Sequence, residues 1–168
     1  VVRELPPALH VDTDPLLLGR ILRNLIDNAI KHGQPGNLTV RLLSLSTQAS
    51  IEIADDGRGI DSKEQAAIFA PFYRSQAGHA EGLGLGLSIV RQLCDLLSIP
   101  ITLQSAVGQG TSFRLLLPLS ANQDPANESL QVLVGTLDPE LASELPPLEA
   151  LLNRWGMHHR RIPATARE

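Results

Sequence analysis

A run with glycine at every second position, Gly82 to Gly86, opens directly into an apolar helical pattern. Glycine weakens the interiors of both strands and helices, so the run itself is unsuited to regular structure. It does allow the backbone to approach a ligand closely where a helix begins. The first N–H groups of a helix have no partner within it, and the helix dipole adds partial positive charge there. The run predicts a phosphate-binding turn. The plain alternative is a flexible loop before a packed helix.

A polar stripe runs along the first helical pattern of the chain, residues 16–32. At about 100° per residue, Asn24, Asn28 and Lys31 fall within a stripe roughly 60° wide. Asparagine is a mediocre helix former, so two of them one turn apart suggest a polar ligand. An amide oxygen suits Mg²⁺, and a lysine ammonium can pair with a phosphate. The alternative is a solvated helix edge.

A third polar stretch, Asp55 to Gly59, follows a predicted strand. Gly57 and Gly59 flank Arg58 and would let the chain pass closely under a flat ligand. A carboxylate at the strand end could then accept a hydrogen bond from an exocyclic amine. Ordinary turn chemistry is the alternative, because Asp and Gly are common in turns.

The elements that must position these residues follow from apolar periodicity. We predict helices over 16–32 and 87–97, a short helix over 61–69, and strands over 9–11, 38–45, 49–54, 101–105 and 111–117. Thr13 or Asp14 is expected to cap the first helix, and Gly33 with Pro35 to end it. Pro118 closes this unit. We expect residues 73–83 to be mobile, because their small residues have little to bury.

The composition indicates a globular domain, with 43% hydrophobic and 19% charged residues among 168. A net charge of −4 without a basic stripe argues against nucleic acid as a partner. The only cysteine, Cys94, excludes an internal disulfide and is expected to be a small buried residue. No apolar run approaches the ~18 residues of a membrane span, so we expect no membrane contact by this chain.

Five short motifs together resemble the ATP-binding domain of histidine kinases. In chain order they are Asn24-Leu25-Ile26-Asp27-Asn28-Ala29 (the N box), Asp55-x-Gly57-x-Gly59-Ile60 (G1), Ile68-Phe69-x-Pro71-Phe72-Tyr73-Arg74 (F), Gly82-x-Gly84-x-Gly86-Leu87 (G2) and Gly108-x-Gly110-Thr111-x-Phe113. Each motif is weak alone, but their common order and spacing make the resemblance specific. It implies the Bergerat (GHKL) fold, an α/β two-layer sandwich with a mixed, largely antiparallel sheet packed on helices.

The resemblance implies ATP and Mg²⁺ as ligands. Asn28 would ligate Mg²⁺, with Asn24 beside it, and Lys31 and His32 would contact the phosphates. Arg74 would reach the γ-phosphate when a lid over the site closes. Asp55 would accept a hydrogen bond from the adenine amine, supported by Thr111. The other implied contact residues are Gly57, Gly59, Ile60, Tyr73, Gly82, Leu83, Gly84, Leu85, Gly86 and Leu87.

The implied reaction is transfer of the γ-phosphoryl group to a histidine on a separate helical dimerisation domain. None of His10, His79, His158 and His159 fits the family's phosphoacceptor motif, so we expect the acceptor helices to precede Val1 in the parent protein. This chain alone is then not expected to autophosphorylate. The resemblance also implies a homodimeric bacterial parent, a response regulator or receiver domain as partner, and a cytoplasmic site for this domain, with an inner-membrane anchor elsewhere in the parent left open.

Two other functions stay open. One is a pseudokinase module that binds ATP and regulates a partner kinase. The other is a different GHKL ATPase, of the gyrase, MutL or chaperone type. Those enzymes usually carry a catalytic Glu one turn before the metal-binding Asn, where this chain has Asn24, which disfavours hydrolysis.

The last fifty residues form a separate question. Residues 119–129 are predicted to be a linker, and 130–168 resemble the start of a receiver domain, with a strand near 130–135, a helical pattern over 139–155 and another strand from 156. Thr136 and Leu137 occupy the places of the paired acids expected after the first strand, leaving Asp138 as the nearby acid. We therefore expect a truncated or degenerate receiver, with a mere C-terminal extension as the alternative.

Overall fold

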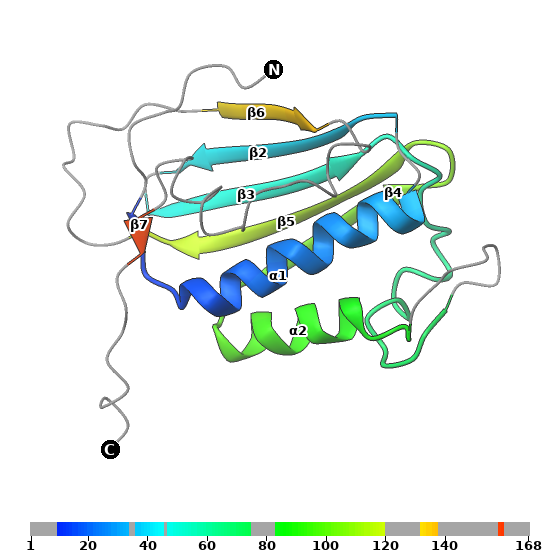
Figure 1. Ribbon diagram of the computed structural model, residues 1–168, viewed down its shortest axis with the longest axis horizontal. Coiled ribbons are helices and arrows are strands. Elements are labelled where there is room, and N and C mark those ends of the chain that lie inside the picture. Colours follow the sequence, from blue (N-terminus) through cyan, green and yellow to red (C-terminus); the bar gives the residue numbers. More distant parts are fainter. Residues whose placement is uncertain are drawn as a thin grey trace.

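The computed structural model describes residues 10–33, 36–45, 47–74, 83–119, 132–137 and 158–159. Its elements form two layers, a twisted sheet and a pair of helices on one face of it (Figure 1). In chain order they are β1 (His10–Val11), α1 (Pro15–Asn28), the π-helical turn η1 (Ala29–Gly33), β2 (Leu38–Ser44), β3 (Gln48–Asp55), α2 (Gly86–Leu96), β4 (Ile101–Ala106), β5 (Gly110–Pro118), β6 (Val132–Leu137) and β7 (His158–His159).

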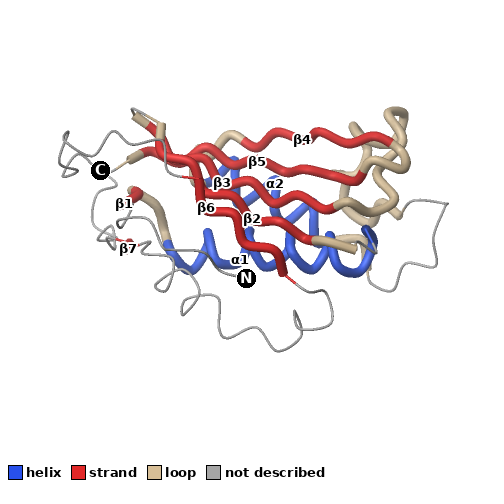
Figure 2. Tube along the Cα trace, turned by 90° about the horizontal axis from the view of Figure 1, so that it is seen from above, coloured by secondary structure: helices blue, strands red, loops and turns tan. Residues whose placement is uncertain are grey.

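The main sheet has five strands in the order β4-β5-β3-β2-β6, and each neighbouring pair is antiparallel. Seen from above, α1 and α2 lie on the same side of these strands (Figure 2). The predicted α/β sandwich is thus confirmed. Among the described strands, parallel pairing occurs only between β1 and β7, which form a separate two-stranded sheet.

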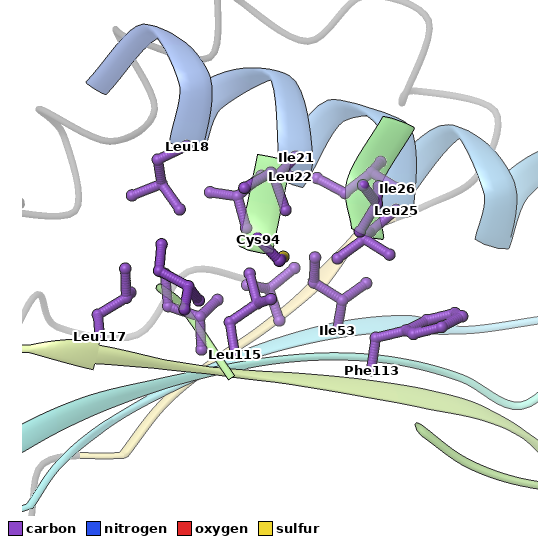
Figure 3. Close-up of a cluster of buried hydrophobic side chains, with 14 of the residues drawn as sticks. Leu18, Ile21, Leu22, Leu25, Ile26, Ile53, Cys94, Phe113, Leu115 and Leu117 are labelled. Carbon is purple, nitrogen blue, oxygen red and sulfur yellow. The ribbon is translucent and has the colours of Figure 1, made fainter. Parts of the chain in front are cut away.

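The core lies between the helices and the sheet. Period-2 alternation places Ile51 and Ile53 of β3 on the helix side, beside Phe113, Leu115 and Leu117 of β5. Figure 3 shows Ile53, Phe113, Leu115 and Leu117 facing the apolar stripe of α1, which consists of Leu18, Ile21, Leu22, Leu25 and Ile26. Cys94 of α2 is buried there, as predicted, and burial raises the pKa of its thiol to about 11. Each buried Leu or Ile contributes about 2 kcal/mol, so this layer fixes how α1 sits on the sheet.

The first helix begins as the sequence indicates. The Asp14 carboxylate accepts hydrogen bonds from Leu16 N at 2.9 Å and Leu17 N at 3.0 Å, and Pro15 occupies the first helical position. Asp14 rather than Thr13 is therefore the cap. The helix continues as η1 to Gly33, so the predicted end is correct, but its last residues follow a wider π-helical turn.

The predicted short helix over 61–69 is wrong, because residues 62–69 form consecutive turns. Asp61 accepts a hydrogen bond from Lys63 N at 2.9 Å, and the Glu64 carbonyl accepts from both Ala67 N and Ile68 N. So short a segment gains little from helical hydrogen bonds alone. Only Ile68 of this stretch is fully buried, so packing does not impose a regular helix.

The C-terminal segment contributes an edge strand. Val132–Leu137 pairs antiparallel with β2, from Leu43 opposite Val132 to Leu38 opposite Leu137. The strand predicted near 130–135 thus forms, and it joins the five-stranded main sheet next to β2. The predicted linker, the helical pattern over 139–155 and most of 73–83 lie outside the described residues, and the division into domains stays a prediction. Among the helices of the described residues, none is long and apolar enough to cross a bilayer.

Candidate functional site

Asp55, at the end of β3, is surrounded by backbone from three other segments. Its Oδ1 accepts a hydrogen bond from Gly57 N at 3.0 Å, and Arg58 N donates to the Gly33 carbonyl at 3.0 Å. Thr111 of β5 is its direct cross-strand neighbour. The turn after β3 is thus fastened to the end of η1, and Asp55 lies between them.

The glycines around Asp55 permit this close approach. A Cβ added at Gly33 would lie 2.9 Å from Asp55 Oδ1, and one at Gly57 would collide with the Gly33 carbonyl oxygen. Gly59, with φ of +69°, would place a Cβ against the Ala106 carbonyl. These positions therefore exclude side chains, and at Gly57 and Gly59 the neighbours are the backbone carbonyls of Gly33 and Ala106, whereas the predicted neighbour was a flat ligand. Gly33 had been interpreted only as a helix terminator.

Burial raises the pKa of the Asp55 carboxyl. The backbone N–H groups of Gly57 and Thr111 lower it in part, and the neighbouring charge of Asp56 raises it further. The carboxylate is thus held by backbone dipoles rather than by a cation. A partly desolvated carboxylate of this kind is a strong acceptor for a ligand N–H group.

Ser105 of β4, which the sequence argument missed, connects Thr111 to the G1 turn. Its Oγ accepts from Ile60 N at 2.8 Å, donates to the Gly110 carbonyl at 2.8 Å and lies 3.0 Å from Thr111 Oγ1. The signal was present in the sequence, because Ser105 continues the apolar alternation of Ile101 and Leu103 with a polar residue at the strand end.

Positive charges act on His32 at the end of η1. The pKa of His32 is lowered by burial first, and then by the positive charges of Arg58, Lys31 and Arg74. The charges of the predicted Lys31 and Arg74, from two segments far apart in sequence, thus both act on the predicted His32. Arg58, which was predicted only as a residue between two glycines, adds a third charge.

The N box faces the start of α2. Asn24 Nδ2 donates to the Arg20 carbonyl at 2.8 Å, and a Cβ at Gly86 would lie 3.4 Å from Asn24 Oδ1. α2 begins at Gly86 without a side-chain cap among the described residues, so its first N–H groups have no partner from a capping side chain there. Asn28 lies one turn further along α1, half-buried on the same face.

The F and G2 segments are joined through their backbones. Phe72 N donates to the Gly84 carbonyl at 3.0 Å, and a Cβ added at Gly84, which has φ of +67°, would lie 2.7 Å from the Tyr73 carbonyl oxygen. Tyr73 Oη donates to Glu64 Oε1 at 2.9 Å. Leu83 is 77% exposed, Leu85 and Leu87 are half-buried, and Gly82 lies outside the described residues.

The sequence profile of a protein family described as histidine kinase-, DNA gyrase B-, and HSP90-like ATPase matches residues 13–121. The chain belongs to this ATPase family. The matched range contains all five motifs, from Asn24 to Phe113.

The relatives narrow the membership to sensor kinases. The sensor histidine kinase RcsC of Salmonella typhimurium is 33% identical over 159 residues, which cover 91% of this chain and 17% of RcsC. The autoinducer 2 sensor kinase/phosphatase LuxQ of Vibrio cholerae is 33% identical over 140 residues, covering 79% of this chain and 16% of LuxQ. The chain thus spans about a sixth of these relatives and is a histidine kinase-type ATPase domain. At 91% coverage, the similarity to RcsC continues beyond residue 121.

Solved structures agree with this membership. The mycobacterial sensor histidine kinase MprB matches with a TM-score of 0.55 and 31% identity, over 67% of this chain and 81% of that one. Full-length ShkA, crystallised with AMPPNP, matches with a TM-score of 0.57 and 25% identity, over 71% of this chain and 27% of ShkA.

Proposed function

We propose that this domain binds ATP with Mg²⁺ and transfers the γ-phosphoryl group to a histidine on a dimerisation domain outside this chain. The observation that carries the proposal is Asp55, a partly desolvated carboxylate fixed by close backbone packing at Gly33 and Gly57. Two further features support it: the positive charges of Lys31, Arg58 and Arg74 act on His32 at the end of η1, and the Asn24 amide lies next to Gly86, where α2 begins. Cations and helix N-termini both suit a polyphosphate.

The opposite end of the site suits a base. Asp55 supplies a desolvated acceptor, and close backbone packing at Gly57 and Gly59 fixes the turn that follows it. An exocyclic amine is the complementary donor, which favours adenine. His32 and Asp55 both lie beside Gly33, so the base end and the phosphate end are joined by the turn η1.

The residues also fit Mg²⁺. This cation is usually held in phosphotransfer enzymes by one or two protein oxygens together with phosphate oxygens and water. The amide oxygen of Asn28 is such a ligand, on the face of α1 that carries Asn24. When bound, Mg²⁺ would neutralise phosphate charge during transfer.

The domain's own contribution to the reaction is positioning and charge. Phosphoryl transfer places little demand on covalent chemistry by the protein, so catalysis depends on alignment and on stabilising charge. Lys31 and His32 would hold the phosphates, with Arg74 directed to the γ-phosphate, while Asp55 fixes the far end of the nucleotide. The acceptor histidine would be the nucleophile, and a receiver domain would take the phosphoryl group next.

Asn24 weighs against a gyrase-type ATPase. Its amide group donates to the Arg20 carbonyl and has no basic site with which to activate water. A pseudokinase that uses ATP as a conformational ligand would share the same binding site, so the test must separate binding from transfer.

Binding is tested by calorimetric titration with a non-hydrolysable ATP analogue and Mg²⁺. We expect Asn28→Ala and Asp55→Asn each to weaken binding at least about tenfold, or 1.4 kcal/mol. The matched controls are Arg23→Ala and Asp27→Asn on the exposed face of α1, which should bind like the unchanged chain. Absence of binding by the unchanged chain would refute the proposal.

Transfer is tested with the parent protein's dimerisation domain added in trans and ATP labelled at the γ position. Label on a histidine of that domain supports the kinase. Intact binding without labelling would favour the pseudokinase, and steady ATP turnover by this chain alone would favour the other ATPases.

A further inference from the structure

Ser105, Thr111 and Asp55 form one row across three adjacent strands. Ser105 of β4 is the cross-strand partner of Thr111 of β5, and Thr111 is the partner of Asp55 of β3. All three are two residues from core positions, namely Leu103, Phe113 and Ile53, so they lie on the helix-facing side of the sheet. Thr111 is only 7% exposed.

The hydrogen bonds of Ser105 determine the direction of the contact with Thr111. A hydroxyl has one hydrogen to donate and two lone pairs to accept with. The Gly110 carbonyl can only accept, so it takes the Ser105 hydrogen at 2.8 Å. Ile60 N can only donate, so it occupies one lone pair at 2.8 Å. The second lone pair is left for Thr111, whose Oγ1 lies 3.0 Å away and must therefore be the donor.

Because the Thr111 hydroxyl donates its hydrogen to Ser105, it can only accept a hydrogen bond from any other partner. Asp55, next in the row, is also an acceptor because its ionised carboxylate has no hydrogen. The row thus offers two neighbouring acceptors and no side-chain donor. Such an edge matches a ligand with an amino group, directly or through a bridging water, and opposes a carbonyl oxygen at the same place.

We propose that Ser105 is a positioning residue that sets Thr111 as an acceptor and thereby sharpens the preference for a 6-aminopurine over a 6-oxopurine. This inference rests on the proposed nucleotide-binding function. Ser105 acts through Thr111 and does not itself contact the base. Gln65 also links Ser105 to Ile60, because its Nε2 donates to the backbone carbonyls of Ser105, at 2.9 Å, and Ile60, at 3.1 Å.

The test compares affinities for ATP and inosine triphosphate, which carries a carbonyl in place of the 6-amino group. In Ser105→Ala the Thr111 hydroxyl is released and can donate to that carbonyl. We expect the ratio of ATP to inosine triphosphate affinity to fall about fivefold, the effect of one hydrogen bond. A general loosening of the site would weaken both nucleotides and leave the ratio unchanged.

Three further variants control this result. Ser112→Ala removes a hydroxyl from β5 that donates to Glu52, away from the row, and should keep the ratio of the unchanged chain. Ser105→Thr retains the hydroxyl and should restore the ratio. Ser105→Cys fills the space with a weakly hydrogen-bonding thiol and should lower the ratio, which provides a second variant if Ser105→Ala does not fold.

The outcomes separate the two proposals. Suppose that the unchanged chain prefers ATP and that Ser105→Ala and Ser105→Cys fold but keep its ratio of ATP to inosine triphosphate affinity. That result overturns the role of Ser105 and leaves the proposal of ATP binding intact. An unchanged chain that binds neither nucleotide overturns both proposals. In a Thr111→Val background, Ser105→Ala should change the ratio no further, and an additional fall there would contradict action through Thr111.

Discussion

Strand β3 carries two carboxylates, Glu52 and Asp55, whose surroundings differ on the two faces of the sheet. Glu52 is 7% exposed and contacts Arg41 at 3.2 Å, Arg114 at 3.5 Å and the Ser112 hydroxyl at 2.7 Å. Burial raises its pKa, but the hydrogen bonds and charges of these partners outweigh burial, and the pKa is lowered. The pKa of Asp55 is raised, because burial acts on a carboxylate held by N–H groups alone.

The difference separates a structural carboxylate from one available to a ligand. The charge of Glu52 is balanced within the protein by cross-strand arginines. Within the described ranges of the chain, the charge of Asp55 is not balanced by a side-chain cation in contact with it, and glycine backbone lies beside it, so its acceptor capacity remains for another molecule. A partly buried carboxylate whose pKa is raised by desolvation is a candidate for a functional role, whereas the lowered pKa of Glu52 reflects its ion pairs.

The largest expected effect comes from filling the space beside Asp55. Gly57→Ala would drive a methyl group into the Gly33 carbonyl, so we expect a loss of about 3 kcal/mol in the free energy of unfolding, at the upper end of the cost of overpacking, and no detectable binding of an ATP analogue. Urea denaturation and calorimetry measure the two effects. Gly36→Ala, with a nearest atom at 3.6 Å, is the control and should be tolerated. A stable Gly57→Ala variant with normal affinity would contradict the packing of Asp55.

The second prediction compares ATP-analogue binding after each carboxylate is replaced by the corresponding neutral amide. Asp55→Asn should weaken ATP-analogue binding at least about tenfold, because the amide can offer its N–H groups to the ligand. Glu52→Gln should leave binding unchanged, since Glu52 faces away from the helices. Equal losses of affinity in the two variants would mean that the contrast between the carboxylates has no bearing on ligand binding.

The third prediction concerns stability, for which we expect the larger loss in Glu52→Gln and the smaller one in Asp55→Asn. Glu52→Gln should lower the free energy of unfolding at pH 7 by about 1–3 kcal/mol, because two partly exposed arginines lose their charged partner. Asp55→Asn should cost less or even stabilise, because it removes a desolvated charge. Chemical denaturation of the two variants provides the comparison.

As the pH falls, the contributions of Glu52 and Asp55 to the free energy of unfolding should change in opposite directions. The pKa of Glu52 is lowered from 4.5, so its stabilisation is complete above that pH and is lost as pH falls through the lower folded-state value. The pKa of Asp55 is raised from 3.8, so its unfavourable contribution is relieved as pH falls through the raised value toward 3.8. We therefore measure the free energy of unfolding by chemical denaturation at several pH values between 7 and 3. Its decrease with falling pH should be steeper in Asp55→Asn and shallower in Glu52→Gln than in the unchanged chain.

The smallest effect is expected at the phosphate end. Removing one of the cations near His32 by Arg58→Ala should raise the pKa of His32 toward its ordinary value of 6.5, although burial would still hold it lower. Nucleotide affinity should fall about threefold, as for one exposed charge pair. Titration of the His32 ring signals by NMR checks the shift, with Arg23→Ala as control, and an unmoved pKa would place Arg58 too far away to act.

Local features could be predicted because they are set by local geometry. Asp14 and Pro15 mark the start of α1, and the glycine spacing of Gly57 and Gly59 indicated a close approach, which the structure shows to be one of backbone to backbone. The polar stripe of Asn24 and Asn28 follows from helical periodicity alone. Residues 61–69 were misjudged because a short segment with one fully buried residue takes its conformation from its neighbours rather than from its own propensity.

The sequence by itself determined the two-layer fold, the family and the three polar stretches, since periodicity, glycine spacing and motif order are all local properties of the chain. Only the tertiary structure decided which residues act on one another across distance: Gly33 against Asp55, the charges of Arg58 and Arg74 on His32, and Ser105 beside Thr111. Strand order and register bring the last pair together, and they depend on core packing between segments that no short motif encodes. The contrast between Glu52 and Asp55 has the same origin, because a carboxylate's pKa depends on the charges that the fold places around it.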